Sequence, residues 1–188
     1  GIPALTAACA VLKDGPVDGD TVLVHGAGGT VARLAVQIAA DSGARVIATT
    51  GDTGKAGAIS DAGAMAVLDY RDPDLAAAVA AIAGADGVSR IIDAEVGTNL
   101  STSIDILHPK GTIVGYGAVL KPVTELPFLK MMFKTLTLSS ILVYLLEAGE
   151  AAAHAEIVKD MLVRGALDVP IDTTLPLAEA ARAHELVE

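Results

Sequence analysis

The stretch that decides the fold is Thr21–Ala32, which reads TVLVHGAGGTVA. Its first five residues form a short, mostly apolar run of the kind found in a buried strand, and a glycine-rich turn follows at once. The apolar spacing of an amphipathic helix comes next, and a second apolar run, Arg45–Thr49, lies about one helix later. This succession is typical of the opening βαβ unit of a dinucleotide-binding fold. Glycines let a pyrophosphate approach the backbone there, and the helix offers unpaired N–H groups.

The small residues of this turn fit the dinucleotide fingerprint in part. Ala27, Gly29 and Ala32 take the three positions that require small residues, and Ala is acceptable at the third, where helix packs on strand. A tight strand-to-helix turn without a ligand has a similar sequence. The turn by itself therefore leaves both interpretations open, and the rest of the chain has to decide between them.

Composition favours a single α/β domain and excludes several kinds of partner. The chain has 188 residues, of which 52% are hydrophobic and 19% charged, and its net charge is −10. Such a high apolar content is expected of a parallel sheet buried on both faces, or of a surface that faces a missing partner. The acidic balance argues against nucleic acid and anionic membranes. No apolar run approaches the ~18 residues of a membrane span, and no signal peptide is visible, so we expect a cytoplasmic protein.

Helix and strand patterns alternate along the chain. We expect helices at 3–12, 30–41, 55–62, 74–83, 100–107 and 150–164, and strands at 21–25, 45–49, 65–68, 90–94, 112–116 and 135–142. This alternation predicts an α/β fold, a doubly wound parallel six-stranded sheet (Rossmann fold) with helices on both faces. No repeat or linker interrupts it, so residues 1–188 are expected to form one dinucleotide-binding domain.

Short motifs spread along nearly the whole chain carry a family resemblance. They are GIPALTA (1–7), GDTVLVHG (19–26), VQIA (36–39), GARVIAT (43–49), KA (55–56), GA (63–64), LDYR (68–71), GTIV (111–114) and LPL (175–177). Together they resemble the cofactor-binding domain of medium-chain dehydrogenases/reductases, and within that superfamily the zinc-free quinone oxidoreductase branch. The turn departs from the family pattern, because Thr30 and Ala32 stand where glycines are usual.

The resemblance implies a partner domain and an activity. Full-length members carry an N-terminal, GroES-like catalytic domain to which nothing here corresponds, so the chain looks like an excised cofactor domain. The implied function is NADP(H) binding in an oxidoreductase that transfers hydride between nicotinamide and a quinone or an unsaturated carbonyl. We expect this chain alone to turn over little or nothing. Two alternatives stay open: a non-catalytic nucleotide-binding or interaction module, and a fragment of an NAD-dependent alcohol dehydrogenase.

The second strand indicates which nicotinamide cofactor is bound. NAD-selective folds usually place an acid at the end of this strand, whereas here it ends at Thr49 and Thr50. Lys55 and Tyr70 fall where the resembled family has a phosphate-binding lysine and an adenosine-side tyrosine. NADP(H) is therefore favoured over NAD(H), although Asp52 could take the ribose role if its loop curls back.

The expected site binds cofactor and holds no metal. Its predicted cofactor-binding residues, several of them placed by the resemblance, are Thr6, Ala27, Gly28, Gly29, Thr30, Val31, Thr50, Lys55, Tyr70, Val96 and Tyr116. No catalytic acid, base or nucleophile stands out. The single cysteine, Cys9, excludes a multi-cysteine zinc site, and none of the four histidines has the spacing of a metal site. We expect Cys9 to pack in the core and His25 to pack beneath the glycine turn.

The strand at 135–142 predicts how the protein assembles. Apolar and polar residues alternate in it, without charge or proline, and it is expected at a sheet edge, where an uncharged strand is a template for pairing. The resembled family joins two such edges across a two-fold axis. A homodimer through residues 135–142 is therefore expected, unless the loop at 120–134 covers the edge and leaves a monomer.

Overall fold

The computed structural model describes residues 1–186 and contains one six-stranded parallel sheet, in the strand order β3-β2-β1-β4-β5-β6. Its strands are β1 (Thr21–Val24), β2 (Arg45–Thr50), β3 (Ala64–Asp69), β4 (Val88–Asp93), β5 (Leu107–Gly115) and β6 (Thr137–Ser140). This is the order of a doubly wound dinucleotide-binding sheet, in which the direction of winding reverses between β1 and β4. The predicted fold class is confirmed.

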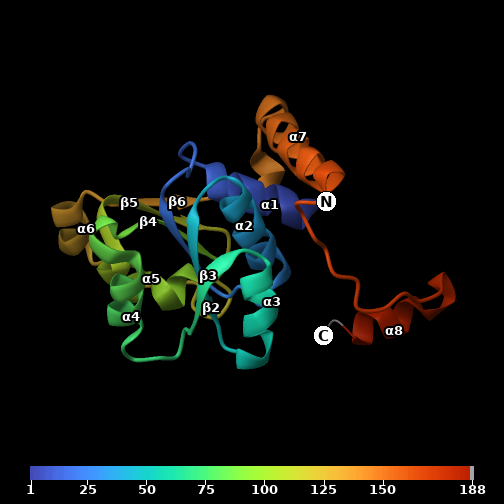
Figure 1. The fold of residues 1–188 in the computed structure, drawn as a ribbon, viewed down its shortest axis with the longest axis horizontal. Coiled ribbons are helices and arrows are strands. Elements are labelled where there is room, and N and C mark those ends of the chain that lie inside the picture. The colour runs from blue at the N-terminus through green and yellow to red at the C-terminus, as the bar shows by residue number, and fades with distance from the viewer. Residues whose placement is uncertain (187–188) are drawn as a thin grey trace.

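Helices cover both faces of this sheet (Figure 1). One layer contains α1 (Ile2–Leu12), α2 (Thr30–Asp41), α3 (Ala56–Asp61) and α7 (Ala148–Arg164), and the other contains α4 (Leu75–Ala83), α5 (Val96–Ile106) and α6 (Phe128–Lys134). Short 3-10 turns lie at η1 (Thr53–Lys55), η2 (Gly84–Asp86), η3 (Val143–Leu145) and η4 (Leu177–Glu179). The last helix, α8 (Ala180–Glu185), lies apart from the sheet at the end of an extended segment (Figure 1).

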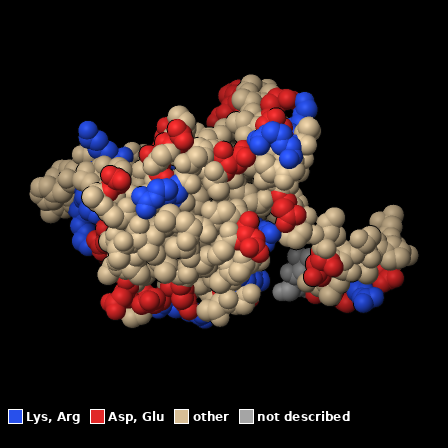
Figure 2. Space-filling view, in the orientation of Figure 1, with Lys and Arg blue, Asp and Glu red and all other residues tan. Residues whose placement is uncertain are grey.

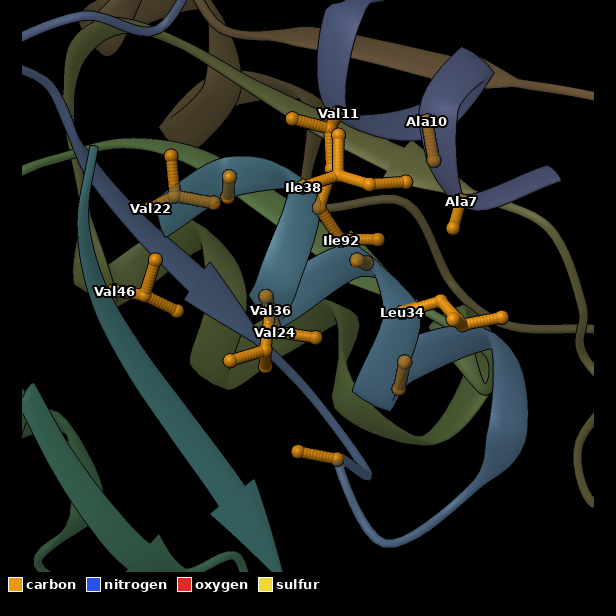
Figure 3. Packing of buried hydrophobic residues seen from close by; sticks show 14 of the residues in the cluster. Ala7, Ala10, Val11, Val22, Val24, Leu34, Val36, Ile38, Val46 and Ile92 are labelled. Atoms are coloured by element: carbon orange, nitrogen blue, oxygen red, sulfur yellow. The ribbon is translucent and has the colours of Figure 1, made fainter. Parts of the chain in front are cut away.

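Alternation along each central strand divides the core into two clusters. Val22 and Val24 of β1 pack with α1 and α2, whereas Leu23 between them packs with α4 and α5. Ile91 and Ile92 of β4 are divided in the same way. Figure 3 shows the first cluster, in which Ile38 and Leu34 of α2 lie over the strands and Ala7, Ala10 and Val11 of α1 close the layer. Because both faces are covered, the central strands are apolar at nearly every position.

Several element boundaries differ from the sequence prediction, those of α5 and β5 most. α5 begins at Val96 rather than at residue 100, because the Val96 N–H donates to the Gly117 carbonyl and fixes the helix start there, despite the low helix propensity of Gly97. β5 begins at Leu107 rather than at 112, with an irregular register between Val88 and Arg90 of β4. β6 covers only Thr137–Ser140, because Thr135 ends α6 in a left-handed conformation with φ of 53°.

The β6 edge of the sheet is open among the described residues. β6 pairs with β5 alone, and Thr137, Leu138 and Ser140 are exposed. Large apolar side chains are also exposed nearby in sequence, on α6 and η3: Phe128, Leu129, Met132, Phe133, Tyr144 and Leu145. Figure 2 shows small groups of charged residues separated by wide uncharged areas. Within residues 1–186, we find no helix with the length and apolarity that a membrane crossing requires.

Candidate functional site

The glycine turn connects β1 to α2 at the edge of the sheet where the parallel strands end. The Ala27 N–H donates to the Thr49 carbonyl at 2.8 Å, and the Gly29 N–H donates to the Gly26 carbonyl at 3.0 Å. Gly26 has a φ of +66°, a left-handed conformation that favours glycine. Gly29 is the N-cap of α2 and offers no side-chain cap. The first N–H groups of α2, beginning at Thr30, are therefore available to an anion.

Three residues predicted to bind cofactor meet beside this turn. A Cβ atom placed on Gly28 would lie 3.3 Å from Lys55 Cδ and 3.4 Å from Thr50 Oγ1. Glycine thus leaves room between the turn and the Lys55 side chain, and Thr50 closes that space from the end of β2. Lys55 comes from η1, the 3-10 turn that follows β2.

Asp52 belongs to the turn that carries Lys55. Its Oδ1 accepts a hydrogen bond from the Gly54 N–H at 3.0 Å, which caps η1, and its Oδ2 lies 4.0 Å from Lys55 Nζ. The Thr50 hydroxyl donates to the Asp52 carbonyl at 3.3 Å and also accepts from the Asp52 N–H at 3.1 Å. The carboxylate therefore has a structural role in shaping the turn.

A cavity of about 420 Å³ opens against the glycine turn, a volume suited to a small-molecule ligand. Ala27, Gly28, Gly29, Thr30 and Lys55 line it, together with Arg33, Leu34, Ala58, Ile59 and residues 168–172. The sequence did not predict Arg33 or the segment 168–172 as part of the site.

The segment 168–172 is held to α2 by polar contacts. Arg33 Nη2 lies 3.0 Å from Asp168 Oδ2. Gln37 Nε2 donates to the Asp168 carbonyl at 3.0 Å, and the Asp168 N–H donates to Gln37 Oε1 at 2.6 Å. Since the partners are more than a hundred residues apart, no local signal in the sequence could have revealed them.

Tyr70 lies over the end of β2 and reaches a second cavity. Its hydroxyl occupies the place that a side chain on Gly51 would take, and the Arg71 guanidinium lies 5.8 Å from the centre of its ring. The second cavity has a volume of about 180 Å³ and is lined by His25, Gly26, Tyr70, Asp93, Ala94, Glu95, Thr98, Asn99 and Leu120. It spans the point between β1 and β4 where the winding of the sheet reverses.

Asp93, at the end of β4, brings a carboxylate to this second cavity. Its Oδ1 accepts hydrogen bonds from the Glu95 N–H at 2.8 Å and from Asn99 Nδ2 at 3.0 Å. Its Oδ2 is buried and has no hydrogen-bond partner among the described residues. A buried oxygen of this kind can accept a hydrogen bond from a bound ligand.

His25 packs beneath the turn, as predicted. It is almost fully buried, with Nδ1 3.1 Å from Thr49 Oγ1 and Nε2 3.4 Å from Ser103 Oγ. Burial lowers the pKa of His25 below its ordinary value, and the nearby negative charge of Asp93 only partly opposes this. The imidazole is thus a neutral link between β1, β2 and α5.

The predicted cofactor-binding residues Val96 and Tyr116 lie just beyond the ends of β4 and β5. Val96 begins α5 and packs against Gly115. The Tyr116 N–H donates to the Asp93 carbonyl at 3.0 Å, and its half-buried ring packs on the first core cluster. Burial, and then the charge of Asp93, raise the pKa of the Tyr116 hydroxyl.

Glu95 fixes the loop that follows β5 near these residues. Its carboxylate accepts hydrogen bonds from three successive backbone N–H groups, those of Val119, Leu120 and Lys121, at 2.8–3.0 Å. These N–H groups, that of Leu120 foremost, hold the pKa of Glu95 below its usual range. The sequence prediction did not identify Glu95.

Thr6 and Val31 line neither cavity, and the same holds for Thr50, Val96 and Tyr116. The Thr6 hydroxyl donates to the Ile2 carbonyl at 2.9 Å within α1, and Val31 packs against the first core cluster. Their contact with a cofactor stays a prediction.

A separate group of side chains could hold a metal ion. One ligand atom each from Cys9 of α1 and from Glu150 and His154 of α7 lie within 4.8 Å of one another. Burial, and then the charge of Glu150, raise the pKa of the Cys9 thiol. Sequence reasoning found Cys9 as a core residue but did not find this cluster, because its members come from opposite ends of the chain.

Comparison with known proteins agrees with this architecture. Residues 30–159 match the family model described as zinc-binding dehydrogenase. A 2-haloacrylate reductase from a Burkholderia species is 30% identical over 173 residues, which are 89% of this chain and 51% of the reductase. The chain spans about half the length of the curated relatives it matches.

Two solved structures share the fold over essentially the whole chain. A mycobacterial quinone oxidoreductase superposes with a TM-score of 0.91 at 30% identity, covering 99% of this chain and 58% of that one. Quinone oxidoreductase from Escherichia coli in complex with NADPH gives a TM-score of 0.84 at 28% identity, covering 100% of this chain and 59% of that one. The family model covers well over half of the 188 residues, and the chain therefore belongs to the zinc-binding dehydrogenase family, in which it is similar to the quinone oxidoreductases.

Proposed function

We propose that the chain is the NADP(H)-binding part of a reductase similar to quinone oxidoreductases. The observation that carries this proposal is the position of Lys55, an unburied cation beside Gly28 and Thr50 at the end of a β2 strand that lacks an acid. A 2′-phosphate requires a positive charge at this position, and an acid there would repel it. The similarity to an oxidoreductase solved with NADPH supports the same choice.

The residues at the site fit the parts of this cofactor. The uncapped start of α2 and the space at Gly28 suit the pyrophosphate, with Lys55 and Thr50 at the adenosine ribose and Tyr70 on the adenosine side. Val96, Tyr116 and Thr6 are assigned to the nicotinamide side. A β-branched residue at Thr30 is compatible with this arrangement, because its side chain is exposed.

The reaction of the whole protein would be a hydride transfer to a quinone or an α,β-unsaturated carbonyl. Bound NADPH would supply the hydride, and solvent would supply the proton that balances it. The chain binds and orients the cofactor, while most of the substrate pocket belongs to a GroES-like catalytic domain beyond these residues. The exposed apolar side chains give such a domain a surface to cover. We expect the 188-residue chain to bind cofactor and to turn over little substrate.

A homodimer through residues 135–142 is also proposed. β6 offers an open, uncharged edge with Leu138 42% exposed, and exposed apolar side chains of α6 and η3 lie close to it in sequence. Such an edge pairs readily with a second copy, and a two-fold partner is the commonest arrangement.

Calorimetric titration of the chain tests the cofactor proposal. NADPH is expected to bind more tightly than NADH, and adenosine 2′,5′-bisphosphate more tightly than AMP. In each pair, only the first ligand carries a 2′-phosphate. Tighter binding of NADH would point to a fragment of an NAD-dependent dehydrogenase instead. Absence of binding by all four ligands would favour a module that has lost nucleotide binding.

A further inference from the structure

Cys9, Glu150 and His154 form a group of three different ligand types away from the nucleotide site. Cys9 lies on α1 and is fully buried, while Glu150 and His154 are half-buried on α7. None of the three lines either cavity at the glycine turn. Glu150 and His154 are four residues apart on one helix, and this spacing puts them on the same face, toward α1.

The distances within this group suit a small metal ion. One sulfur, one nitrogen and one oxygen atom lie within 4.8 Å of one another. A tetrahedral zinc ion with bonds of about 2.0–2.3 Å holds such atoms about 3.5 Å apart. Rotation of the half-exposed Glu150 and His154 side chains can supply the difference, and the ion can enter from their side.

Two further observations support a bound ion at this group: an unpaired buried nitrogen and a weakly anchored half of α7. His154 Nδ1 is buried and has no hydrogen-bond partner among the described residues. Buried polar atoms are ordinarily satisfied, so this nitrogen calls for a partner. In addition, the buried residues of α7 are Val158 and Met161, both in its C-terminal half. The N-terminal half of α7 has no buried apolar anchor, and this half carries Glu150 and His154.

We propose that Cys9, Glu150 and His154 bind a zinc-type divalent cation that fastens the N-terminal half of α7 to α1. Thiolate, imidazole and carboxylate are together the donor set of zinc rather than of magnesium or calcium. On binding, the Cys9 thiol gives its proton to solvent and forms the metal–sulfur bond. Three protein ligands leave the fourth tetrahedral position to water.

Cobalt(II) alone, titrated into the metal-free 188-residue chain, tests the site. One equivalent is expected to bind with a thiolate-to-metal absorption band in the near ultraviolet, and one equivalent of zinc is expected to remove the band. Cys9→Ser should abolish the band. His154→Gln and Glu150→Gln should each weaken binding by more than about 100-fold, since even the loss of a group behind a ligand costs about 10–100-fold. The matched controls, His184→Gln and Glu156→Gln, should leave binding unchanged.

Hydrogen exchange gives a second readout that is independent of the spectrum and of any enzyme activity. Zinc is expected to slow amide exchange in the first turns of α7 in the parent chain and in both controls, but not in His154→Gln. A variant that fails to fold would be seen by circular dichroism, and the two remaining ligand variants would then carry the test. Absence of saturable cobalt binding overturns the proposal, as does binding that is indifferent to both His154→Gln and Glu150→Gln.

Discussion

At the scale of single residues, the proposed preference for NADP(H) rests on Lys55 and Asp52. They are three residues apart. From the sequence, either Lys55 could bind a 2′-phosphate or Asp52 could bind the ribose at the end of β2. The structure engages the Asp52 carboxylate with the Gly54 N–H, whereas Lys55 faces Gly28 across the space that a side chain would fill. Lys55 thus adjoins the glycine turn, while the Asp52 carboxylate caps the loop through Oδ1 and lies 4.0 Å from Lys55 Nζ through Oδ2.

Replacing Lys55 tests this assignment directly. Lys55→Ala is expected to weaken NADPH binding by ~1–3 kcal/mol, the scale of a hydrogen bond to a charged group, and to leave NADH binding nearly unchanged. Calorimetry with both cofactors measures the difference. Lys110 is an exposed lysine in the N-terminal half of β5, whereas the glycine turn lies beyond the C-terminal ends of the strands. Lys110→Ala therefore serves as the control. Equal losses for NADPH and NADH in Lys55→Ala would contradict a 2′-phosphate role.

His25 is the residue whose burial makes stability depend on pH. Its pKa in the folded chain is lowered, chiefly by burial, so the unfolded chain binds more protons below the ordinary pKa of about 6.5. The contribution of His25 to the free energy of unfolding should therefore be fully present above pH 7. It should be lost progressively as the pH drops below ~6.5.

Urea unfolding at a series of pH values between about 5.5 and 7.5 measures this effect, since the window lies around the ordinary pKa of histidine. His25→Gln should flatten the slope of stability against pH, whatever it does to stability at neutral pH. His184→Gln, on exposed α8, should keep the slope of the parent chain. A parent chain that is equally stable across the window would refute a neutral, buried His25.

At the scale of elements, the packing of α2 on the sheet positions the whole glycine turn. Ala32 is 2% exposed and belongs to the core cluster that joins α2 to β1. It lies three residues after Gly29 and four after Gly28, so a shift of the helix would also move the N–H groups that are proposed to bind phosphate. The small side chain is what permits this close approach.

Ala32→Leu should therefore affect both folding and binding. We expect a loss of ~1–3 kcal/mol in the free energy of unfolding through overpacking, and loss of NADPH binding. Ala153→Leu makes the same change on an exposed position of α7 and should alter stability by less than about 0.5 kcal/mol. Denaturant melts and calorimetry measure the two effects. Normal binding by Ala32→Leu would show that the position tolerates a large side chain.

At the scale of the whole molecule, the exposed apolar surface and the open β6 edge support the proposal that another domain or a second copy packs against them. Exposed apolar residues lie on α6, around η3 and in the loop before α6, while the sheet itself is sealed between two helix layers. The surplus of apolar residues seen in the composition is therefore divided between a doubly covered sheet and an uncovered surface. Burial of the sheet on both faces therefore explains part of the apolar composition, and a partner that covers the exposed residues stays a proposal.

Pairing through β6 can be tested with charges. Light scattering at micromolar concentration should give a dimer for the parent chain, and Leu138→Lys or Thr137→Lys should give a monomer, because an edge lysine opposes strand pairing. Val163→Lys, on a position of α7 that is 80% exposed, should remain a dimer. A monomeric parent chain, or a dimer that both edge lysines leave intact, would exclude this interface.

The order of elements, the parallel sheet and the position of the glycine turn could all be predicted from the sequence. Those features depend on local sequence patterns. Val22, Leu23 and Val24 alternate between the two core clusters. The small residues Ala27, Gly29 and Ala32 indicate the strand-to-helix turn without reference to distant parts of the chain. The proximity of Gly28 and Thr50 is consistent with the carboxyl ends of adjacent parallel strands lying at one edge of a sheet, whereas Lys55 was placed at the site by the family resemblance.

Contacts between distant parts of the chain could not be predicted and became visible in the folded protein. Arg33 and Gln37 hold Asp168 beside the cavity at the glycine turn, and Cys9 meets Glu150 and His154 between α1 and α7. The start of α5 at Val96 depends on a carbonyl from beyond β5 in the same way. Periodicity reports which face of an element is buried, but it carries no information about which side chain far along the chain will be packed against it.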